Sequence, residues 1–312
     1  WSVSAQFFTN GVITASLLPR LPEVKASFAL TDTAYGFLVV AMPAGSIAAA
    51  TIAGPLIRRF GALRVAAIGT VSLAFLLAAA GFSPWAWMFA LFMALAGFSD
   101  AILDSGQNVH GLAVERWYGK SIINSMHAAW SLGATAGGVI GAASAAAGLP
   151  LGQQLLAGAV LWSAVAVVSA LGGAVPEHFL RPAEAHPAAP APTTPTSPPA
   201  ECKVPVPPSG RRFPWALFIP LALLAICGTL VEDIASNWVT LYLNREVGAG
   251  IGLAGMGFAT MLAAQFVGRI LGDPMTDRWG RAAVARFGGL AIAAGGLAAV
   301  LAPSPWLAIA GF

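Results

Sequence analysis

The chain consists largely of apolar stretches of about 20 residues, the length at which an α-helix crosses the hydrocarbon core of a bilayer. Only 9% of its residues are charged, whereas soluble domains carry roughly 25%. Such a chain cannot cover its surface with polar groups, so lipid must be its main solvent. We expect helices at roughly 2–19, 34–57, 65–82, 85–114, 123–147, 150–174, 213–243, 251–273 and 283–302, and a tenth that begins near Pro305 and is cut off at Phe312. The predicted fold class is an all-α membrane protein.

Two short segments between apolar stretches resemble each other. Residues 54–64 read GPLIRRFGALR and residues 273–281 read DPMTDRWGR, and aligning Gly61 with Gly280 gives an offset of 219 residues. An internal repeat of this size is typical of transporters built from repeated bundles. Because the first half holds six expected helices, the offset predicts a second bundle of six, truncated so that about 9.5 helices are present. Since residue 1 is Trp rather than Met, we expect the start to be missing as well.

A proline-rich segment separates the two halves. Residues 182–208 contain ten prolines with Ala, Thr and Ser and almost no large apolar side chains. This composition is typical of a disordered tether with polyproline II character, although it also suits docking to an SH3-like groove of a partner. We therefore divide the chain into a six-helix bundle at 1–175, a cytoplasmic linker at 176–212 and an incomplete bundle at 213–312.

The distribution of basic residues predicts the orientation. If the N-terminus lies inside, twelve Lys and Arg residues fall on the cytoplasmic side and three on the other, which follows the positive-inside rule. The formal net charge of +3 is then a consequence of topology, and no nucleic-acid partner is expected. We expect a multi-pass protein of a bacterial inner membrane, with its N-terminus and linker in the cytoplasm.

The second repeat segment carries an acid, an Arg, a Gly and a basic residue at Asp277, Arg278, Gly280 and Arg281. This pattern resembles the inner-loop motif of the major facilitator superfamily, and the resemblance extends over the whole chain. It implies a major facilitator fold of two six-helix bundles, in which charge pairs of this loop help to hold the inward gate closed. In the first copy Arg58 occupies the acidic position, so we expect gating in the first half to differ.

The second copy also has Asp273 where the motif usually begins with Gly. The gating candidates come from the two copies and from the segment after the first helix: Arg20, Arg58, Arg59, Gly61, Asp277, Arg278, Gly280 and Arg281.

The run from Asp104 to Asn108 resembles the fourth helix of the fucose permease branch of that superfamily. In that branch an acid followed four residues later by Asn lies in the central cavity and serves proton-coupled sugar uptake. The segments around Arg20, His127 and 232–238 resemble uncharacterised bacterial members near this branch. The resemblance implies proton-coupled transport and does not fix a substrate.

On the fourth expected helix, polar residues and one glycine recur at spacings of three or four and so share one face: Asp100, Asp104, Asn108, Gly111 and Glu115. A charged side chain at membrane depth is costly unless it has water, a partner or a proton. We interpret Asp104 as a proton-coupling acid that faces a water-filled cavity; the alternative is a static pair with an Arg. Near the helix end, we expect Glu115 to pair with the neighbouring Arg116 or Lys120.

Two further helices carry polar faces. On the first, Gln6, Asn10 and Thr14 recur every four residues, and they either line a cavity or hydrogen-bond neighbouring helices. On the fifth, His127, Ser131 and Thr135 share one face that we expect to line the cavity, and His127 either relays protons or is a hydrogen-bonded structural residue. The other side of the fifth helix carries a GxxxGxxxG row that permits close helix contact, at Gly133, Gly137 and Gly141.

The seventh expected helix holds a polar cluster toward its outer half: Glu232, Asp233, Asn237 and Trp238. Two acids so close are costly to ionise together, so either one is protonated or one pairs with Arg20. We expect an outer gate or substrate contacts here, with Trp238 either stacking on a sugar ring or anchoring the helix at the membrane interface. On the eighth helix we expect Arg269 to pair with Asp273 or Asp277.

These patterns predict a secondary active transporter that moves a small polar solute, such as a sugar, by alternating access. The proton-coupling candidates are Asp104, His127, Glu232 and Asp233, and the substrate-binding candidates are Gln6, Asn10, Asn108, Asn237 and Trp238. No nucleotide-binding motif or clear sodium site is present, which favours H⁺ as the coupling ion; we expect no cofactor and no metal, and we expect a monomer. A proton-coupled drug or metabolite exporter would share these features. A non-transporting receptor or an intramembrane enzyme is disfavoured, because the four scattered histidines and two cysteines form no catalytic or metal set.

Overall fold

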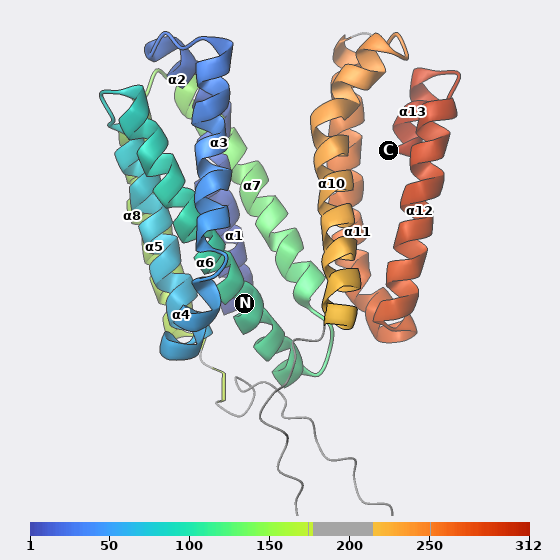
Figure 1. Cartoon of the computed structure of the whole chain (residues 1–312), viewed down its shortest axis with the longest axis horizontal. Helices are drawn as coiled ribbons and strands as arrows, with labels where there is room; N and C mark the ends of the chain where they lie inside the picture. The colour runs from blue at the N-terminus through green and yellow to red at the C-terminus, as the bar shows by residue number, and fades with distance from the viewer. Residues whose placement is uncertain (174, 177–214, 250) are drawn as a thin grey trace, which may run out of the picture. The chain divides into compact units, whose positions relative to one another are not determined.

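The computed structural model describes residues 1–173, 175–176, 215–249 and 251–312, with the backbone alone for some residues between 217 and 262 (Figure 1). Within these residues all regular structure is helical, and no strand occurs. The chain forms two compact units: unit 1 comprises Trp1–Pro182 and Phe266–Val284, and unit 2 comprises Ala183–Gln265 and Ala285–Phe312. The expected linker lies almost wholly outside the described residues.

The helices of the N-terminal segment of unit 1 are α1 (Ser2–Ala15), η1 (Leu18–Arg20), α2 (Leu21–Ser27), α3 (Asp32–Ala49), α4 (Ala53–Phe60), α5 (Ala62–Gly81), α6 (Ala86–Tyr118), α7 (Ile123–Ala146) and α8 (Leu151–Leu171). The later helices are α10 (Trp215–Arg245), α11 (Ile251–Trp279), α12 (Arg281–Leu301) and α13 (Pro305–Gly311). The last turns of α11 belong to unit 1. Except in the stretch at 34–57, the long helices fall where the apolar stretches predict them, and the all-α prediction is confirmed.

The prediction of one helix over 34–57 is wrong, because the structure divides this stretch into α3 and α4 between Ala49 and Ala53. Pro55 explains the break. In a continuous helix its ring would clash with the carbonyl group four residues earlier, whereas proline is tolerated in the first turn of a new helix. The first repeat segment therefore begins as a short separate helix.

α1 and α7 pack closely along the glycine row of α7. A Cβ atom at Gly133 would lie 2.1 Å from the Phe8 carbonyl oxygen, and one at Gly137 would lie 2.4 Å from that of Val12. Cβ atoms do not approach other atoms so closely, so only glycine permits this contact. The predicted role of the GxxxGxxxG row is confirmed, and the packing fixes α1 against the helix that carries His127.

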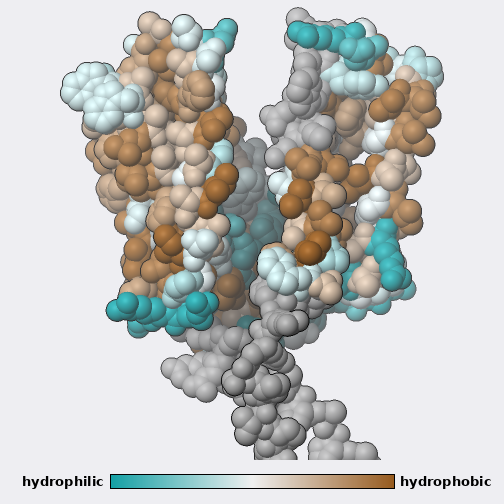
Figure 2. Space-filling view, viewed as in Figure 1, coloured by the Kyte–Doolittle hydropathy of each residue, from teal (hydrophilic) through white to brown (hydrophobic). Residues whose placement is uncertain are grey.

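The core of unit 1 lies where α5 packs against α6 and α8, and it includes the buried side chains of Leu73, Leu77, Phe89 and Leu103. Many large apolar side chains are nevertheless exposed, and Figure 2 shows extended hydrophobic surface on the helices. Among the described residues, α3, α5, α6, α8 and α12 are long and apolar enough to cross a membrane. Exposed apolar surface of this extent is expected where lipid is the solvent.

Candidate functional site

α6 presents an acid and an amide on an accessible face of unit 1. The side-chain amide of Asn108 donates to the Asp104 backbone carbonyl oxygen at 2.9 Å and to the carboxylate Oδ1 at 3.2 Å. Asp104 is exposed in unit 1, so water or a solute can reach it. One turn earlier, Asp100 lies close to Asp104 and Asn10, and its Oδ1 is buried without a hydrogen-bond partner among the described residues. α6 thus places one accessible and one largely enclosed carboxylate one turn apart.

His127 of α7 lies near Asp104, close enough for the two side chains to interact electrostatically. The Phe7 ring packs edge-on against the imidazole, with ring centroids 5.2 Å apart. One turn further along α7, Ser131 Oγ donates to the His127 backbone carbonyl oxygen at 3.2 Å and accepts from the Arg269 guanidinium. The structure therefore brings together two predicted proton-coupling residues and adds a hydroxyl and a guanidinium nearby.

Gln6 and Asn10 lie inside unit 1 rather than on its accessible face, since their side chains are 1% and 3% exposed. Gln107 Nε2 of α6 donates to the Gln6 backbone carbonyl oxygen at 3.1 Å, and Thr14 Oγ1 donates to Asn10 Oδ1 at 3.2 Å. The side-chain amide of Gln6 has no hydrogen-bond partner in the part of the chain that the structure describes. In this conformation their burial favours helix packing over solute contact.

The candidates on α10 are Glu232, Asp233, Asn237 and Trp238, and their side chains lie outside the described residues. Their assignment to proton coupling, substrate binding or an outer gate stays a prediction.

Arg20 is held inside unit 1, so the structure corrects the expectation that it pairs with an acid of α10. Its Nε donates to Glu23 Oε2 at 2.6 Å, its Nη1 to Gln154 Oε1 at 2.6 Å, and its Nη2 to the Leu149 carbonyl oxygen at 2.8 Å. The hydrogen bond from Arg20 holds the pKa of Glu23 below its ordinary value. Because all three guanidinium nitrogens are bonded here, Arg20 ties the end of α1 to the start of α8.

The end of α11 caps the start of α7. Asp273 is 3% exposed and accepts hydrogen bonds from the backbone N–H of Ser125 at 2.7 Å, from that of Asn124 at 3.1 Å, and from both of their side chains. The N-cap residue of α7 is Ile122, whose side chain provides no cap. The Asp273 carboxylate therefore satisfies N–H groups of the first turn and complements the positive end of the helix dipole.

Two more residues after Asp273 reach the same region. Asp277 Oδ1 accepts from the Ser121 backbone N–H at 2.9 Å. Arg281 forms an ion pair with the buried Glu115, whose other carboxylate oxygen accepts from the backbone at the start of α7. We call the bonds that Asp273, Asp277 and Arg281 make here the α11 contact.

The α11 contact corrects two expectations that rest on nearness in sequence. Glu115 pairs with Arg281, 166 positions away, in place of the expected neighbouring basic residue. Asp273 and Asp277, expected to pair with Arg269, instead bond to α7 and to the loop before it. The reason is geometric: adjacent residues on a helix point in different directions, while a second helix can approach directly.

The two repeat segments share a backbone turn but differ in their charges. Gly61 and Gly280 each follow a helix end with φ of +85° and +81°, a conformation that side chains with a Cβ rarely adopt. Arg58 stands where the second copy has Asp277. The exposed basic residues of the two segments' helix ends are Arg58, Arg59 and Arg278. Those of the first copy form no ion pair with any residue that the structure describes.

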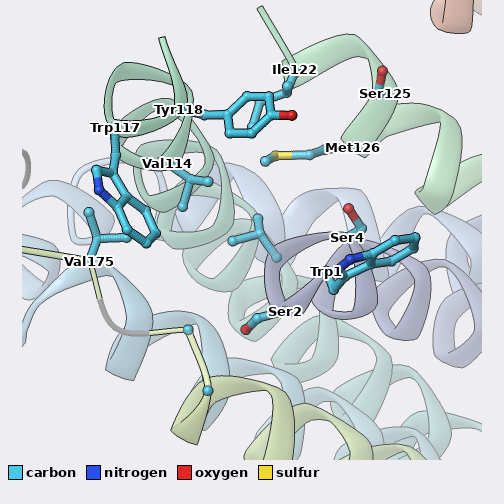
Figure 3. A pocket seen from close by; sticks show the side chains of 13 residues that line it. Trp1, Ser2, Ser4, Val114, Trp117, Tyr118, Ile122, Ser125, Met126 and Val175 are labelled. Carbon is cyan, nitrogen blue, oxygen red and sulfur yellow. The ribbon is translucent and has the colours of Figure 1, made fainter. Parts of the chain in front are cut away.

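A cavity of about 620 Å³ lies between the start of α1, the end of α6 and the start of α7 (Figure 3). Trp117, Tyr118 and Met126 form much of its wall, and Ser4 is among its few polar side chains. Of the predicted substrate-binding residues whose side chains are described, none lines it. Because its wall is mainly apolar, this cavity does not offer the set of polar contacts expected for a sugar.

The chain matches the family model of the Major Facilitator Superfamily over residues 3–312. It belongs to that superfamily. Among its relatives, the uncharacterized transporter y4wD of Sinorhizobium fredii is 28% identical over 310 residues, covering 99% of this chain and 76% of the relative. An uncharacterized MFS-type transporter of Yersinia pestis is 26% identical over 311 residues, covering 100% and 74%. The membrane protein MosC of Rhizobium meliloti is 24% identical over 318 residues, covering 100% and 70%.

Membership in the Major Facilitator Superfamily confirms the resemblance drawn from the second repeat segment and the predicted fold class. It identifies the chain as a member of a family of membrane transporters. The likeness to the fucose permease branch stays a prediction.

Sequence reasoning missed Asp273 as a partner of α7. One signal for Asp273 was available, because α7 begins after Ile122, and an apolar N-cap residue leaves the first N–H groups without a local partner. The spacing of four residues marks Ser131 as sharing a helix face with His127, but no signal in the sequence predicts its bond to Arg269, 138 positions away.

Proposed function

We propose that this major facilitator transporter moves a small polar solute, such as a sugar or a similar metabolite, by proton-coupled secondary active transport. The observation that carries the proposal is the accessible face where Asp104, Asn108 and His127 meet. An accessible carboxylate beside an imidazole can take up and release a proton, and an amide can hydrogen-bond a solute hydroxyl.

The residues divide into proton and solute roles. Asp104 carries the coupled proton, and His127 stabilises its charged form or exchanges the proton with it. Asn108 and Ser131 contact the solute. Gln6 and Asn10 act mainly by positioning α1 against α6, where Asn10 lies close to Asp100. The candidates on α10, Glu232, Asp233, Asn237 and Trp238, supply the matching contacts of the second half.

The α11 contact is proposed to be one gate of the alternating-access cycle. Its acceptors and donors belong to helix ends, so moving the junction of α11 and α12 away from α6 and α7 breaks them together. Arg278 and Gly280 shape the turn that presents Asp277 and Arg281. Since Arg58 cannot accept hydrogen bonds, the first repeat segment cannot form a contact of the same kind. Arg20 serves as a fixed anchor of unit 1.

The proposed orientation follows the basic residues. The N-terminus, both repeat segments and the linker face the cytoplasm, and the protein works as a monomer in a bacterial inner membrane.

The test uses the full-length protein in proteoliposomes with an internal pH dye, challenged with a panel of sugars and small metabolites. Wild type is compared with Asp104→Asn and with Asp32→Asn, a matched loss of an exposed carboxylate that pairs with Lys25. We expect solute-dependent proton movement in wild type and Asp32→Asn, and its loss in Asp104→Asn. Equal proton movement in Asp104→Asn would refute Asp104 as the coupling acid, and solute movement without protons would refute coupling.

A further inference from the structure

An apolar groove of about 420 Å³ runs along the outside of unit 1 where α4, α5 and α6 meet. Its lining includes Leu56 and Phe60 at one end and Leu76 and Leu95 toward the other. Ile68 on its rim is exposed. The groove plays no part in the proposed transport site or in the α11 contact, which use other faces of α6.

Three arginines belong to the chain segment that forms one end of this groove, and one of them is in contact with its lining. The Arg59 guanidinium lies 5.3 Å from the ring centroid of Phe60, a residue of the groove lining. Arg64 directly precedes Val65, which also lines the groove, and Arg58 lies next to Arg59. All three arginines are exposed and have no carboxylate partner among the residues that the structure describes. Figure 2 shows hydrophilic residues gathered at the lower edge of this unit, around the end of α4, beneath a hydrophobic surface.

The length of the groove matches one leaflet of a bilayer. Along α5 its lining extends from Val65 to Leu76, which at 1.5 Å per residue is about 16 Å. The hydrocarbon core of a bilayer is about 30 Å thick, so each leaflet supplies acyl chains over about half of that. An apolar channel of this length with cationic groups at one end has the shape and charge of a phospholipid site.

We propose that the groove binds an anionic phospholipid, with one acyl chain along α5 and the phosphate between Arg59 and Arg64. A guanidinium suits a phosphate because it donates two parallel hydrogen bonds to its oxygens. The first repeat segment carries the positive charge of Arg58 at the position where the second has Asp277, which accepts a hydrogen bond from Ser121. The bound lipid neutralises this positive charge. The anionic lipid thereby stabilises the turn at Gly61.

The test uses the full-length protein in phosphatidylcholine bilayers with a trace of phosphatidylglycerol that carries a photoreactive group near the end of one acyl chain. Illumination followed by peptide mapping locates the adducts, and competition with unlabelled lipids ranks their affinities. We expect adducts near Leu76 and Leu95. Since each Arg near a membrane surface strengthens anionic lipid binding about fivefold, phosphatidylglycerol should compete roughly 30-fold better than phosphatidylcholine.

Three variants distinguish charge from shape. Arg59→Gln/Arg64→Gln should reduce the preference for phosphatidylglycerol to about twofold or less. Ser72→Phe, which fills the groove, should remove the adducts while leaving the arginines in place. Arg286→Gln, which removes an exposed arginine of α12, should behave as wild type. Equal competition by the two lipids in wild type, adducts outside the groove, or a preference that survives loss of both arginines would each overturn the proposal.

Discussion

Replacing the buried Asp273 by Asn should weaken the α11 contact more than replacing an exposed residue of the contact does. Asp273 accepts four hydrogen bonds, two at Oδ1 from Asn124 and two at Oδ2 from Ser125. The amide of Asn keeps one acceptor oxygen and turns an NH₂ group toward the donors at the other position. The variant therefore loses two bonds and the charge that complements the start of α7.

The size of this effect follows from burial. A hydrogen bond to a charged group contributes about 1.5–3 kcal/mol, so two lost bonds with partial relaxation amount to about 3 kcal/mol. Each 1.4 kcal/mol changes an equilibrium constant tenfold. The ratio of molecules with the α11 contact formed to molecules with it broken should therefore fall on the order of 100-fold. Asp277→Asn is the matched control: Asp277 is exposed and accepts one bond from Ser121, so its loss should change the ratio by about fivefold or less.

Spin labels at positions 118 and 279 can measure this ratio. Tyr118 and Trp279 are 65% and 57% exposed, and they lie at the ends of α6 and α11. In a background without Cys202 and Cys227, pulsed electron resonance should show a short distance in wild type and a second, longer population in Asp273→Asn. A distribution unchanged from wild type, or a larger shift in Asp277→Asn, would refute the reasoning.

Two further predictions concern stability. Gly133→Ala places a methyl group 2.1 Å from the Phe8 carbonyl oxygen and should lower the free energy of unfolding by about 2–3 kcal/mol. Gly138→Ala, whose Cβ meets nothing within 4 Å, should raise it by up to about 1 kcal/mol; equal melting temperatures for the two variants would contradict the packing argument. Because the hydrogen bond from Arg20 lowers the pKa of Glu23, ionised Glu23 stabilises the fold above its ordinary pKa of 4.5, and this stabilisation is lost as the pH falls through the lowered pKa. The melting temperature of Glu23→Gln should therefore fall less than that of wild type on acidification, and parallel profiles would contradict this.

Features that repeat or recur along the sequence could be predicted. Helix positions follow from apolar length, and the matching turns at Gly61 and Gly280 follow from the repeat. The close packing of α1 on α7 follows from glycine spacing. The prediction of a single helix over 34–57 was wrong because it rested on the length of the apolar stretch and did not take account of Pro55.

Pairings between distant residues could not be predicted. Glu115 binds Arg281 and Asp273 binds the start of α7, and each pairing depends on which helix ends meet in space. A single sequence does not show which helix ends lie close together. At most it shows that a local hydrogen-bond partner is missing, as at the N-cap residue Ile122. In contrast, Asp104 and His127 could both be singled out, because a polar residue within an apolar stretch stands out before its neighbours are known.

The most direct test of proton-coupled transport compares two modes of the same reconstituted protein. Once a solute is identified, two quantities are measured for wild type and Asp104→Asn. One is the accumulation of the solute driven by an imposed proton gradient, and the other is its one-for-one exchange across the membrane at equal pH. Exchange requires only that the loaded site faces each side in turn, whereas accumulation requires a proton to bind on one side and leave on the other. We expect Asp104→Asn to retain exchange and to lose accumulation. Accumulation at the wild-type level in Asp104→Asn would show that Asp104 is not the coupling acid.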